Sequence, residues 1–475
     1  MHVENLRLKF PKSEKLLFND LDLAIRSGEK VLLLGPSGSG KSTFLHVLAG
    51  IIPQAVDVPM KCSSIEHPDS WGFVFQDPDS QFCMPYADEE LAFVLENVQV
   101  PREEMPGKID LLLDSVKLKL QDPHTKISTL SGGMKQKLAI ASVLALEPDT
   151  LFLDEPTSML DVESTKSIWD IVKETCQDKT LLIIEHKLDH VLEIIDRIIL
   201  FNEHGNILAD GSKENILSKY RDTLKELGVW YPEAWEDHLS SRPPSVLKVP
   251  GPIKLNLEDF RGYVKKEVKI HIPKATIHVG DWIAIKGENG AGKSTFLHSL
   301  MHFIRTTGTY EVDGIQVGGR DLPPDCAFVF QNPEFQFVTN SVFEEVAYTY
   351  RLQGMEEETV KRKVHRLLKR FKLLSYKFHH PYHLSMGQKR RLSVAASIVM
   401  DKGILLLDEP TFGQDASNTF ALLDMLQVYQ KEGYTILMVT HDQMIMDHYA
   451  TRKWVIEKGK LVQDLDNEVV RRKAL

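Results

Sequence analysis

Two glycine-rich segments with one shared pattern stand far apart in this chain of 475 residues. Residues 35–42 read GPSGSGKS and residues 287–294 read GENGAGKS. In such a loop the backbone N–H groups can curl round a polyphosphate at the N-terminus of a helix, where larger side chains would block close approach. The expected phosphate-binding residues are Gly35, Pro36, Ser37, Gly38, Ser39 and Gly40 in the first copy and Gly287, Glu288, Asn289, Gly290, Ala291 and Gly292 in the second.

The residues that close each loop suit a nucleoside triphosphate and its metal ion. Lys41 and Lys293 would reach the β- and γ-phosphates, and the hydroxyls of Ser42 and Ser294 would bind Mg²⁺. An accidental glycine-rich turn is the alternative, but the pattern should arise by chance in roughly one chain in fifty of this length, and two copies make chance negligible. The further hydroxyl donors to the phosphates are Thr43 and Thr295.

A pair of acidic residues follows an apolar run in each half of the chain. Asp154 and Asp408 end these runs, where an aspartate can hold Mg²⁺ through its water shell. Each aspartate is followed by a glutamate, Glu155 or Glu409, which could orient or deprotonate the water that attacks the γ-phosphate. We therefore expect a metal-binding aspartate and a catalytic glutamate in each half.

A histidine ends the next apolar run in both halves, His186 in the first and His441 in the second. A single histidine at such a place is more often a structural residue than a catalytic one, by roughly three to one. The matched placement in both copies reverses that judgement, so we expect both histidines to act in catalysis.

All these matched residues recur at offsets between 252 and 255 positions. The chain is therefore expected to hold two homologous units. A proline-rich run at residues 240–252 favours extended or turn conformations and is interpreted as the linker. The expected domains are residues 1–235 and 253–475, with the linker at 236–252.

The motifs follow short apolar runs that suit buried parallel strands. Residues 31–34 and 282–285 precede the glycine loops, while helical patterns fill the gaps between such runs. Alternating strands and helices predict an α/β fold with an open, mostly parallel sheet, whose ligand crevice lies beyond the carboxyl ends of the strands. The remaining runs are residues 151–153, 181–184, 404–407 and 436–439.

Composition narrows the classes of partner. The net charge of −10 argues against nucleic acid, and the basic runs at residues 361–363 and 389–391 are interpreted as solvated helix faces. The four cysteines have no metal-binding or disulfide spacing. No apolar stretch is long enough to cross a bilayer, and no signal peptide is recognised at the N-terminus. We therefore expect membrane contact only through partner proteins.

Two further segments identify a family. The sequences LSGGM at residues 130–134 and LSMGQ at 384–388 resemble the signature of ABC-type ATPases. Gln76 and Gln331 match the family's Q-loop, and Asp161 and Asp415 match its D-loop. The resemblance implies ATP as the nucleotide, the two glutamines as further ligands of ATP and Mg²⁺, and two P-loop domains. Each domain would have a mostly parallel core sheet, an antiparallel β subdomain and a helical signature subdomain.

The same resemblance implies that the two units pack head to tail within one chain. The nucleotide on Lys293 would then also contact the first signature, and the nucleotide on Lys41 the second. Met134 and Met386 depart from the usual LSGGQ, and the side chain of Met386 could crowd a phosphate or change the local backbone. We expect a slower Lys41 site; two equally active sites are the alternative. The signature residues concerned are Ser131, Gly132 and Gly133, and Ser385 and Gly387.

The Q-loops indicate what hydrolysis drives. They read QDPDSQF at residues 76–82 and QNPEFQF at 331–337, which resembles the ATPases of energy-coupling factor (ECF) importers. That resemblance implies a transmembrane coupling subunit, a membrane substrate-binding subunit, and a peripheral location on the cytoplasmic face of the cell membrane. The substrate would be a vitamin, a vitamin precursor or a metal ion, with hydroxymethylpyrimidine (HMP)/thiamine importers the most similar group.

Two competing functions stay open at this point. Tandem ATPases of monosaccharide importers have similar length, but their second unit usually has altered catalytic motifs. Soluble tandem factors that act on ribosomes usually have a long, charged linker. In this family an aromatic residue commonly stacks on adenine, and Phe10 and Tyr263 are the candidates, with Phe260 as a competitor of Tyr263.

Overall fold

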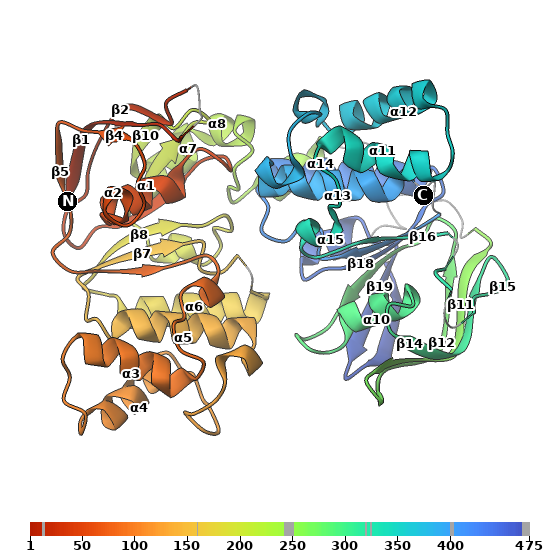
Figure 1. Ribbon diagram of the computed structural model, residues 1–475, viewed down its shortest axis with the longest axis horizontal. Coiled ribbons are helices and arrows are strands. Elements are labelled where there is room, and N and C mark those ends of the chain that lie inside the picture. Colours follow the sequence, from red (N-terminus) through yellow and green to blue (C-terminus); the bar gives the residue numbers. More distant parts are fainter. Residues whose placement is uncertain are drawn as a thin grey trace. The chain divides into compact units, whose positions relative to one another are not determined.

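The computed structural model describes residues 1–11, 15–158, 160–241, 251–318, 321–323, 325–399 and 403–467. It divides the chain into two compact units (Figure 1). Unit 1 comprises Met1–Ala234 with Asp415–Ser417, and unit 2 comprises Trp235–Gln414 with Asn418–Leu475. The expected linker begins inside a helix of unit 2, α9 (Ala234–Ser240), and its residues 242–250 lie outside the described residues. The domain limits at 235 and 253 stay predictions.

Unit 1 contains a six-stranded sheet in the order β10-β9-β3-β8-β7-β6. Only β9 and β10 pair antiparallel, so five neighbouring strands are parallel. Every residue of β7 and β8 is buried, which explains why both strands are apolar in their central positions. The strands are β3 (Lys30–Leu34), β6 (Trp71–Val74), β7 (Thr150–Asp154), β8 (Thr180–Ile184), β9 (Arg197–Phe201) and β10 (Ile207–Ser212).

A second, antiparallel sheet and a group of helices complete unit 1. In the small sheet, β1 (His2–Leu8) pairs with β2 (Phe18–Ala24), β4 (Met60–Lys61) and β5 (Ser64–Glu66). Helices α3, α4 and α5 lie together as a separate helical part (Figure 1). The helices are α1 (Lys41–Leu48), α2 (Ile51–Gln54), α3 (Ala87–Asn97), α4 (Met105–Ser115), α5 (Gly132–Leu144), α6 (Val162–Thr175), α7 (Lys213–Lys219) and α8 (Arg221–Glu226).

In unit 2 the two kinds of sheet are continuous. Ten strands run in the order β15-β14-β11-β12-β20-β19-β13-β18-β17-β16, with β19, β13, β18, β17 and β16 parallel. The strands are β11 (Ile253–Val264), β12 (Glu267–His278), β13 (Trp282–Lys286), β14 (Arg305–Val312), β15 (Ile315–Gln316), β16 (Cys326–Val329), β17 (Ile404–Asp408), β18 (Thr435–Val439), β19 (Arg452–Glu457) and β20 (Lys460–Asp466).

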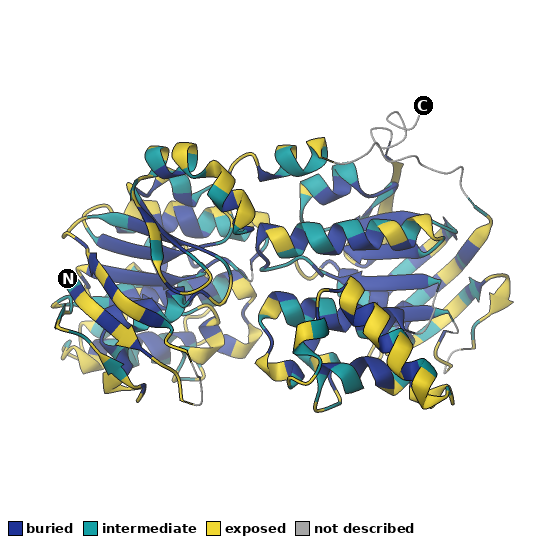
Figure 2. Cartoon of the chain, turned by 90° about the horizontal axis from the view of Figure 1, so that it is seen from above, coloured by how far each residue is buried: buried dark blue, intermediate teal, exposed yellow. Residues whose placement is uncertain are grey.

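The helices of unit 2 repeat the plan of unit 1. They are α10 (Lys293–Leu300), α11 (Val342–Leu352), α12 (Glu357–Arg370), α13 (Met386–Ile398), α14 (Ala416–Lys431) and α15 (Gln443–His448), with α9 packed beside them. In α12 the buried residues Val360, Val364, Leu367 and Leu368 form one face, as expected for an amphipathic helix. Figure 2 shows buried residues concentrated in the central strands and exposed residues on the outer turns of the helices.

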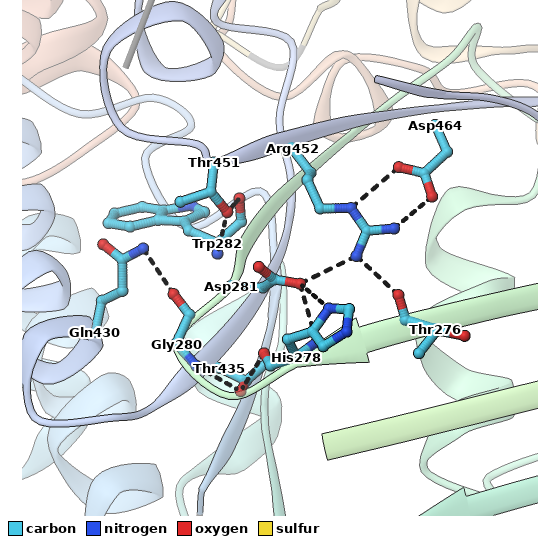
Figure 3. Close-up of polar contacts among 10 residues, drawn as sticks. All are labelled: Thr276, His278, Gly280, Asp281, Trp282, Gln430, Thr435, Thr451, Arg452 and Asp464. Atoms are coloured by element: carbon cyan, nitrogen blue, oxygen red, sulfur yellow. Dashed lines mark hydrogen bonds and ion pairs between the residues drawn. The ribbon is translucent and has the colours of Figure 1, made fainter. Parts of the chain in front are cut away.

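A partly buried arginine joins the two sheet regions at the edge where the parallel strands begin. Arg452, at the start of β19, donates to the Thr276 carbonyl at 2.7 Å and to Asp281 at 3.0 Å, and it also pairs with Asp464 at 3.1 Å (Figure 3). We call these four residues the arginine clamp. Unit 1 has the same device: Arg197 donates to the carbonyl of Ala24 and to the carboxylates of Glu29 and Asp210. The clamp lies at the opposite ends of the strands from the glycine loops.

Candidate nucleotide-binding sites

The glycine loop of unit 1 connects β3 to α1. Gly35 needs to be glycine, because a β-carbon there would lie 2.8 Å from the carbonyl oxygen of Phe201. Gly40 precedes the helix with a φ of 93°, a conformation that glycine adopts without strain. The Lys41 ammonium is buried and donates to the carbonyls of Gly35 and Pro36 at 2.8 and 3.0 Å. The lysine is therefore held over the loop that would receive the phosphates.

Unit 2 repeats this loop between β13 and α10. Gly292 precedes the helix with a φ of 104°, and Lys293 donates to the carbonyls of Gly287 and Glu288 at 2.8 and 3.0 Å. The two lysines thus make the same contacts at the same distances. Burial lowers the pKa of Lys41, and the carboxylates of Glu155 and Asp154 oppose that change. The predicted phosphate-binding residues therefore lie together in both units.

Beside each glycine loop a serine hydroxyl donates a hydrogen bond to an aspartate carboxylate. Ser42 Oγ lies 3.0 Å from Asp154 Oδ1, and Ser294 Oγ lies 3.1 Å from Asp408 Oδ1. Adjacent oxygen ligands in an octahedral Mg²⁺ shell, each about 2.1 Å from the ion, are about 3 Å apart. Burial, with the neighbouring charge of Glu155, raises the pKa of Asp154 to about 6, and burial also raises the pKa of Asp408. A bound cation would favour the ionised carboxylates, so both pairs fit Mg²⁺.

The catalytic candidates of unit 1 form a connected group around Glu155. His186 Nε2 lies 2.9 Å from one carboxylate oxygen of Glu155, and Gln76 Nε2 donates to the other at 2.9 Å. Burial raises the pKa of Glu155, but the charge of His186 outweighs it, so the pKa lies below its usual value. Burial likewise lowers the pKa of His186, and Glu155 reverses that change. The structure thus brings the predicted glutamate, glutamine and histidine of unit 1 together.

Both glutamates have a left-handed backbone, with φ of 48° at Glu155 and 45° at Glu409. This conformation is uncommon for residues other than glycine and stores strain. It is held in place because the Glu155 N–H donates to the Ile184 carbonyl at 2.9 Å, and Glu409 donates to Val439 at 3.1 Å. Each glutamate is therefore anchored to the last residue of the strand that precedes the histidine, β8 or β18.

The corresponding group in unit 2 is looser. His441 Nε2 lies 3.3 Å from Glu409 Oε1, yet it makes no hydrogen bond within the part of the chain that the structure describes. Among the described residues, no hydrogen bond joins the Gln331 side chain to Glu409, whereas Gln76 Nε2 donates to Glu155 in unit 1. The histidine and glutamate are close in both units, but of the described residues only those of unit 1 join glutamate, glutamine and histidine directly.

The signature residues begin the third helix of each helical part. Ser131 caps α5 by accepting from the Met134 N–H, and Ser385 caps α13 by accepting from the Gln388 N–H, each at 3.4 Å. Met386 is the first residue of α13 and its side chain is 48% exposed. The helix therefore starts regularly at Met386, so of the two possible effects of this side chain a changed local backbone is not observed, and crowding of a phosphate stays a prediction. The roles of Ser131, Gly132, Gly133, Ser385 and Gly387 with nucleotide stay predictions.

The aromatic candidates for adenine differ in exposure. Phe10 is 42% exposed at the end of β1. Tyr263 is partly exposed, with its hydroxyl 3.2 Å from Thr307 Oγ1 and Arg305 over its ring. Phe260 is 1% exposed and packs against Tyr310 in the core. Of the two candidates in unit 2, only Tyr263 is accessible to a ligand.

The sequence did not predict a role or burial for two polar residues near the sites, Glu185 and Arg390. Glu185 is buried beside His186 and accepts from Thr157 at 2.8 Å, and burial raises its pKa to about 7. Arg390 belongs to the basic run at 389–391, which was interpreted as a solvated helix face. That interpretation is wrong for Arg390, which is 3% exposed and donates to the carbonyls of Phe330 and Gln331. Its place in the run offered no signal of burial.

Comparisons with known proteins agree with this geometry. The family described as "ABC transporter" matches residues 18–158 and 270–412. The chain is 37% identical, over 97% of its length and 90% of the relative, to "Putative HMP/thiamine import ATP-binding protein YkoD" of Bacillus subtilis. It is 32% identical to a "Putative ABC transporter ATP-binding protein" of Methanosarcina mazei, over 97% of this chain and 88% of the relative.

A solved structure of similar fold is that of the archaeal ribosome recycling factor aABCE1, in complex with the ribosomal stalk protein aP1. The TM-score is 0.64, with 20% identity, and the match covers 98% of this chain and 91% of that chain. At this identity the likeness shows the fold alone.

Proposed function

The chain belongs to the ABC transporter family, with two P-loop ATPase domains in tandem, and from this premise we propose that it is the energy-coupling subunit of an ECF-type importer. It binds and hydrolyses ATP, as membership of this family indicates. Among the described residues, no helix combines the length and apolar character needed to cross a membrane. The relatives are ATP-binding proteins of ABC transporters, which implies membrane partner subunits. We place this chain at the cytoplasmic face of the membrane as part of the proposal.

The observation that carries the ECF proposal is the structure that follows each Q-loop glutamine. Pro78 and Pro333 each begin a short 3₁₀ turn, and the second glutamine of each Q-loop is anchored on the signature helix. Gln81 Nε2 donates to the Ala139 carbonyl at 3.1 Å, and Gln336 Nε2 donates to the Ser393 carbonyl at 2.9 Å. Because each turn is fixed to the signature helix of its unit, the turn and the helix can transmit movement to a protein that binds at the turn.

The turn of unit 2 also presents apolar side chains to solvent. Phe335 is 76% exposed and Val338 is 71% exposed. Exposed apolar side chains beside an anchored turn suit contact with another protein, and we assign this contact to the transmembrane coupling subunit. The corresponding positions in unit 1 are Ser80 and Cys83. The proposed contact is therefore more apolar on unit 2.

The substrate proposal follows the Bacillus subtilis relative. Its printed name is that of an HMP/thiamine import protein, so we propose a vitamin precursor or vitamin of this kind as the cargo. A separate membrane subunit would bind it, and the chain would supply the energy. Two ATP molecules would lie at composite sites, each between the glycine loop of one unit and the signature of the other, and closure of these sites would move the membrane subunit.

Within each unit the roles are proposed residue by residue. Lys41 and Lys293 bind the phosphates, and Ser42, Asp154 and Gln76, with Ser294, Asp408 and Gln331, would hold Mg²⁺, which neutralises phosphate charge when bound. Glu155 and Glu409 orient the attacking water and accept its proton, while His186 and His441 hold these glutamates and contact the γ-phosphate. The strained glutamate backbones are consistent with this role.

The test is to purify the native chain from membranes in mild detergent, identify its partners, and measure vitamin uptake in cells that carry Lys41→Ala/Lys293→Ala. We expect integral membrane proteins to copurify, and uptake to be lost in the double variant while the variant still copurifies with them. A chain found in ribosomal fractions and absent from membranes would contradict the proposal.

A further inference from the structure

In unit 2 a buried cation joins the Q-loop to the signature helix. The guanidinium of Arg390, on α13, donates through Nη1 to the Phe330 carbonyl at 2.6 Å and through Nη2 to the Gln331 carbonyl at 2.5 Å. Burial lowers its pKa to about 10, so it is charged at neutral pH, and the carboxylates of Asp408 and Glu409 favour the charged form. The cation therefore links the Q-loop backbone to the signature helix of the same unit.

Two serines of the same helix extend this link. Ser393 Oγ donates to Gln336 Oε1 at 2.7 Å, and Gln336 Nε2 donates to Ser397 Oγ at 2.9 Å. The Ser397 hydroxyl in turn lies 3.1 Å from the Phe328 carbonyl in β16. We call Arg390, Ser393 and Ser397 the stitch, because they fasten α13 along one side to β16 and the Q-loop.

Unit 1 lacks all three side chains of the stitch. Gln136 stands at the position of Arg390, and its buried Nε2 has no hydrogen-bond partner among the residues that the structure describes. Ala139 and Val143 replace the two serines. Both units share two links between the turn and the signature helix. One is an ion pair, Lys135–Asp79 at 2.7 Å in unit 1 and Lys389–Glu334 at 2.5 Å in unit 2. The other is the hydrogen bond from the second glutamine of the Q-loop to a helix carbonyl, described above.

The first glutamine of each Q-loop is held differently as a result. In unit 1 the Gln76 side chain donates to Glu155, so it is fixed to the catalytic residue. In unit 2 the backbone of Gln331 is fixed to α13 through Arg390. Hydrogen bonds from a charged donor are about twice as strong as neutral ones, and those to buried acceptors are costly to break.

We propose that Arg390 is a positioning residue that makes the Q-loop and signature helix of unit 2 move as one body, whereas in unit 1 these two parts move more independently. ATP binding at unit 2 would then displace its Q-loop and its signature together. In unit 1 the Q-loop would respond mainly to whether Glu155 still accepts the hydrogen bond from Gln76. This inference requires ATP binding only and does not depend on the import proposal.

The test is hydrogen exchange of the full chain, read by mass spectrometry on segments 330–338 and 386–398 of unit 2 and segment 75–83 of unit 1. In Arg390→Gln, which copies unit 1, we expect amides in 330–338 to exchange about tenfold faster or more, since bonds to a charged donor are lost. Segment 75–83 and strands β17 and β18 should be unchanged. Addition of ATP should change exchange in 330–338 and 386–398 together in the native chain, and separately in the variant.

Two further variants separate positioning from folding. Arg391→Gln removes the same charge from the same helix, but Arg391 donates to Asn418 on α14, so 330–338 should exchange as in the native chain. Ser393→Ala, a milder change, should speed exchange in 330–338 severalfold even if Arg390→Gln fails to fold. The proposal would be overturned if Ser393→Ala left exchange in segment 330–338 unchanged. It would also be overturned if Arg390→Gln and Ser393→Ala both gave faster exchange spread evenly over unit 2.

Discussion

At the scale of single residues, the two sites differ in the buried residue that directly precedes each catalytic histidine. Glu185 stands directly before His186 in unit 1, and Thr440 stands before His441 in unit 2. The carboxyl of Glu185 accepts from the Thr157 hydroxyl and from the His186 N–H at 3.0 Å, but it is enclosed in the core. A carboxyl in such a place is more stable with its proton on.

This burial predicts a pH dependence of stability for unit 1. Since the pKa of Glu185 is raised from 4.5 to about 7, the folded chain binds a proton between these values that the unfolded chain releases. The free energy of unfolding therefore falls as pH rises from about 4.5 to 7. Glu185→Gln should remove this loss and raise the free energy of unfolding at pH 8 by on the order of 3 kcal/mol, with little effect below pH 4.5.

Denaturant unfolding at a series of pH values, followed by probes in unit 1, measures this effect. Glu203→Gln is the control, because Glu203 is exposed and its loss should leave the pH dependence as in the native chain. An identical pH profile in Glu185→Gln and the native chain would show that Glu185 is ionised in the folded state.

How far the sequence predicted these residues depends on what each one contacts. Lys41, Ser42, Asp154 and Glu155 lie within short motifs beside apolar runs, so their proximity could be inferred from the order of strands in a parallel sheet. Arg390 could not be recognised, because its burial depends on the carbonyls of Phe330 and Gln331, about sixty positions earlier in the chain. Charge runs indicate a helix face, and tertiary packing decides which member is enclosed.

At the scale of elements, the central strands were predictable and the links between them were not. The apolar run at 31–34 became β3 (Lys30–Leu34), and that at 436–439 became β18 (Thr435–Val439), because a central parallel strand is buried on both faces. The arginine clamp had no sequence signal. Arg452 pairs with a residue 171 positions away, and only the register of β19 beside β13 brings them together.

The clamp predicts an element-level loss of stability. Arg452→Ala removes charge-assisted bonds to β12, to the turn before β13 and to β20, and leaves Asp281 buried without this partner. We expect the free energy of unfolding of unit 2 to fall by about 2–3 kcal/mol. Arg197→Ala should do the same in unit 1. Thermal unfolding with hydrogen exchange assigned to each unit would measure both.

The control for this experiment is an exposed ion pair. Lys361 on α12 pairs with Glu358 at 2.8 Å in full contact with solvent, so Lys361→Ala should leave Tm unchanged. If Arg452→Ala were equally without effect, the clamp would be a surface pair of no energetic consequence.

At the scale of the whole molecule, duplication has produced two units with the same plan and different internal connections. Unit 1 joins Gln76, Glu155 and His186 directly, while unit 2 joins its Q-loop to α13. The signature that begins α13 also carries Met386, a half-exposed residue in the first turn of this helix, and a helix N-terminus is where an anion would approach. If the units pair head to tail, this methionine faces the nucleotide held by Lys41.

The last prediction concerns unequal hydrolysis. Glu155 lies in the same unit as Lys41, and in the proposed head-to-tail pairing the bulk of Met386 should make their site the slower one. Glu409→Gln should therefore remove most of the ATPase activity of the chain, and Glu155→Gln should leave most of it, because loss of a general base costs about 10²–10⁴-fold at its own site. Steady-state ATP hydrolysis by the two single variants and the double variant measures this. Met386→Gly tests whether the methionine is the cause. When it is combined with Glu409→Gln, it should raise the ATP hydrolysis rate that remains. Equal rates in the two single variants would mean that the side chain of Met386 turns away from the nucleotide and that both sites work alike.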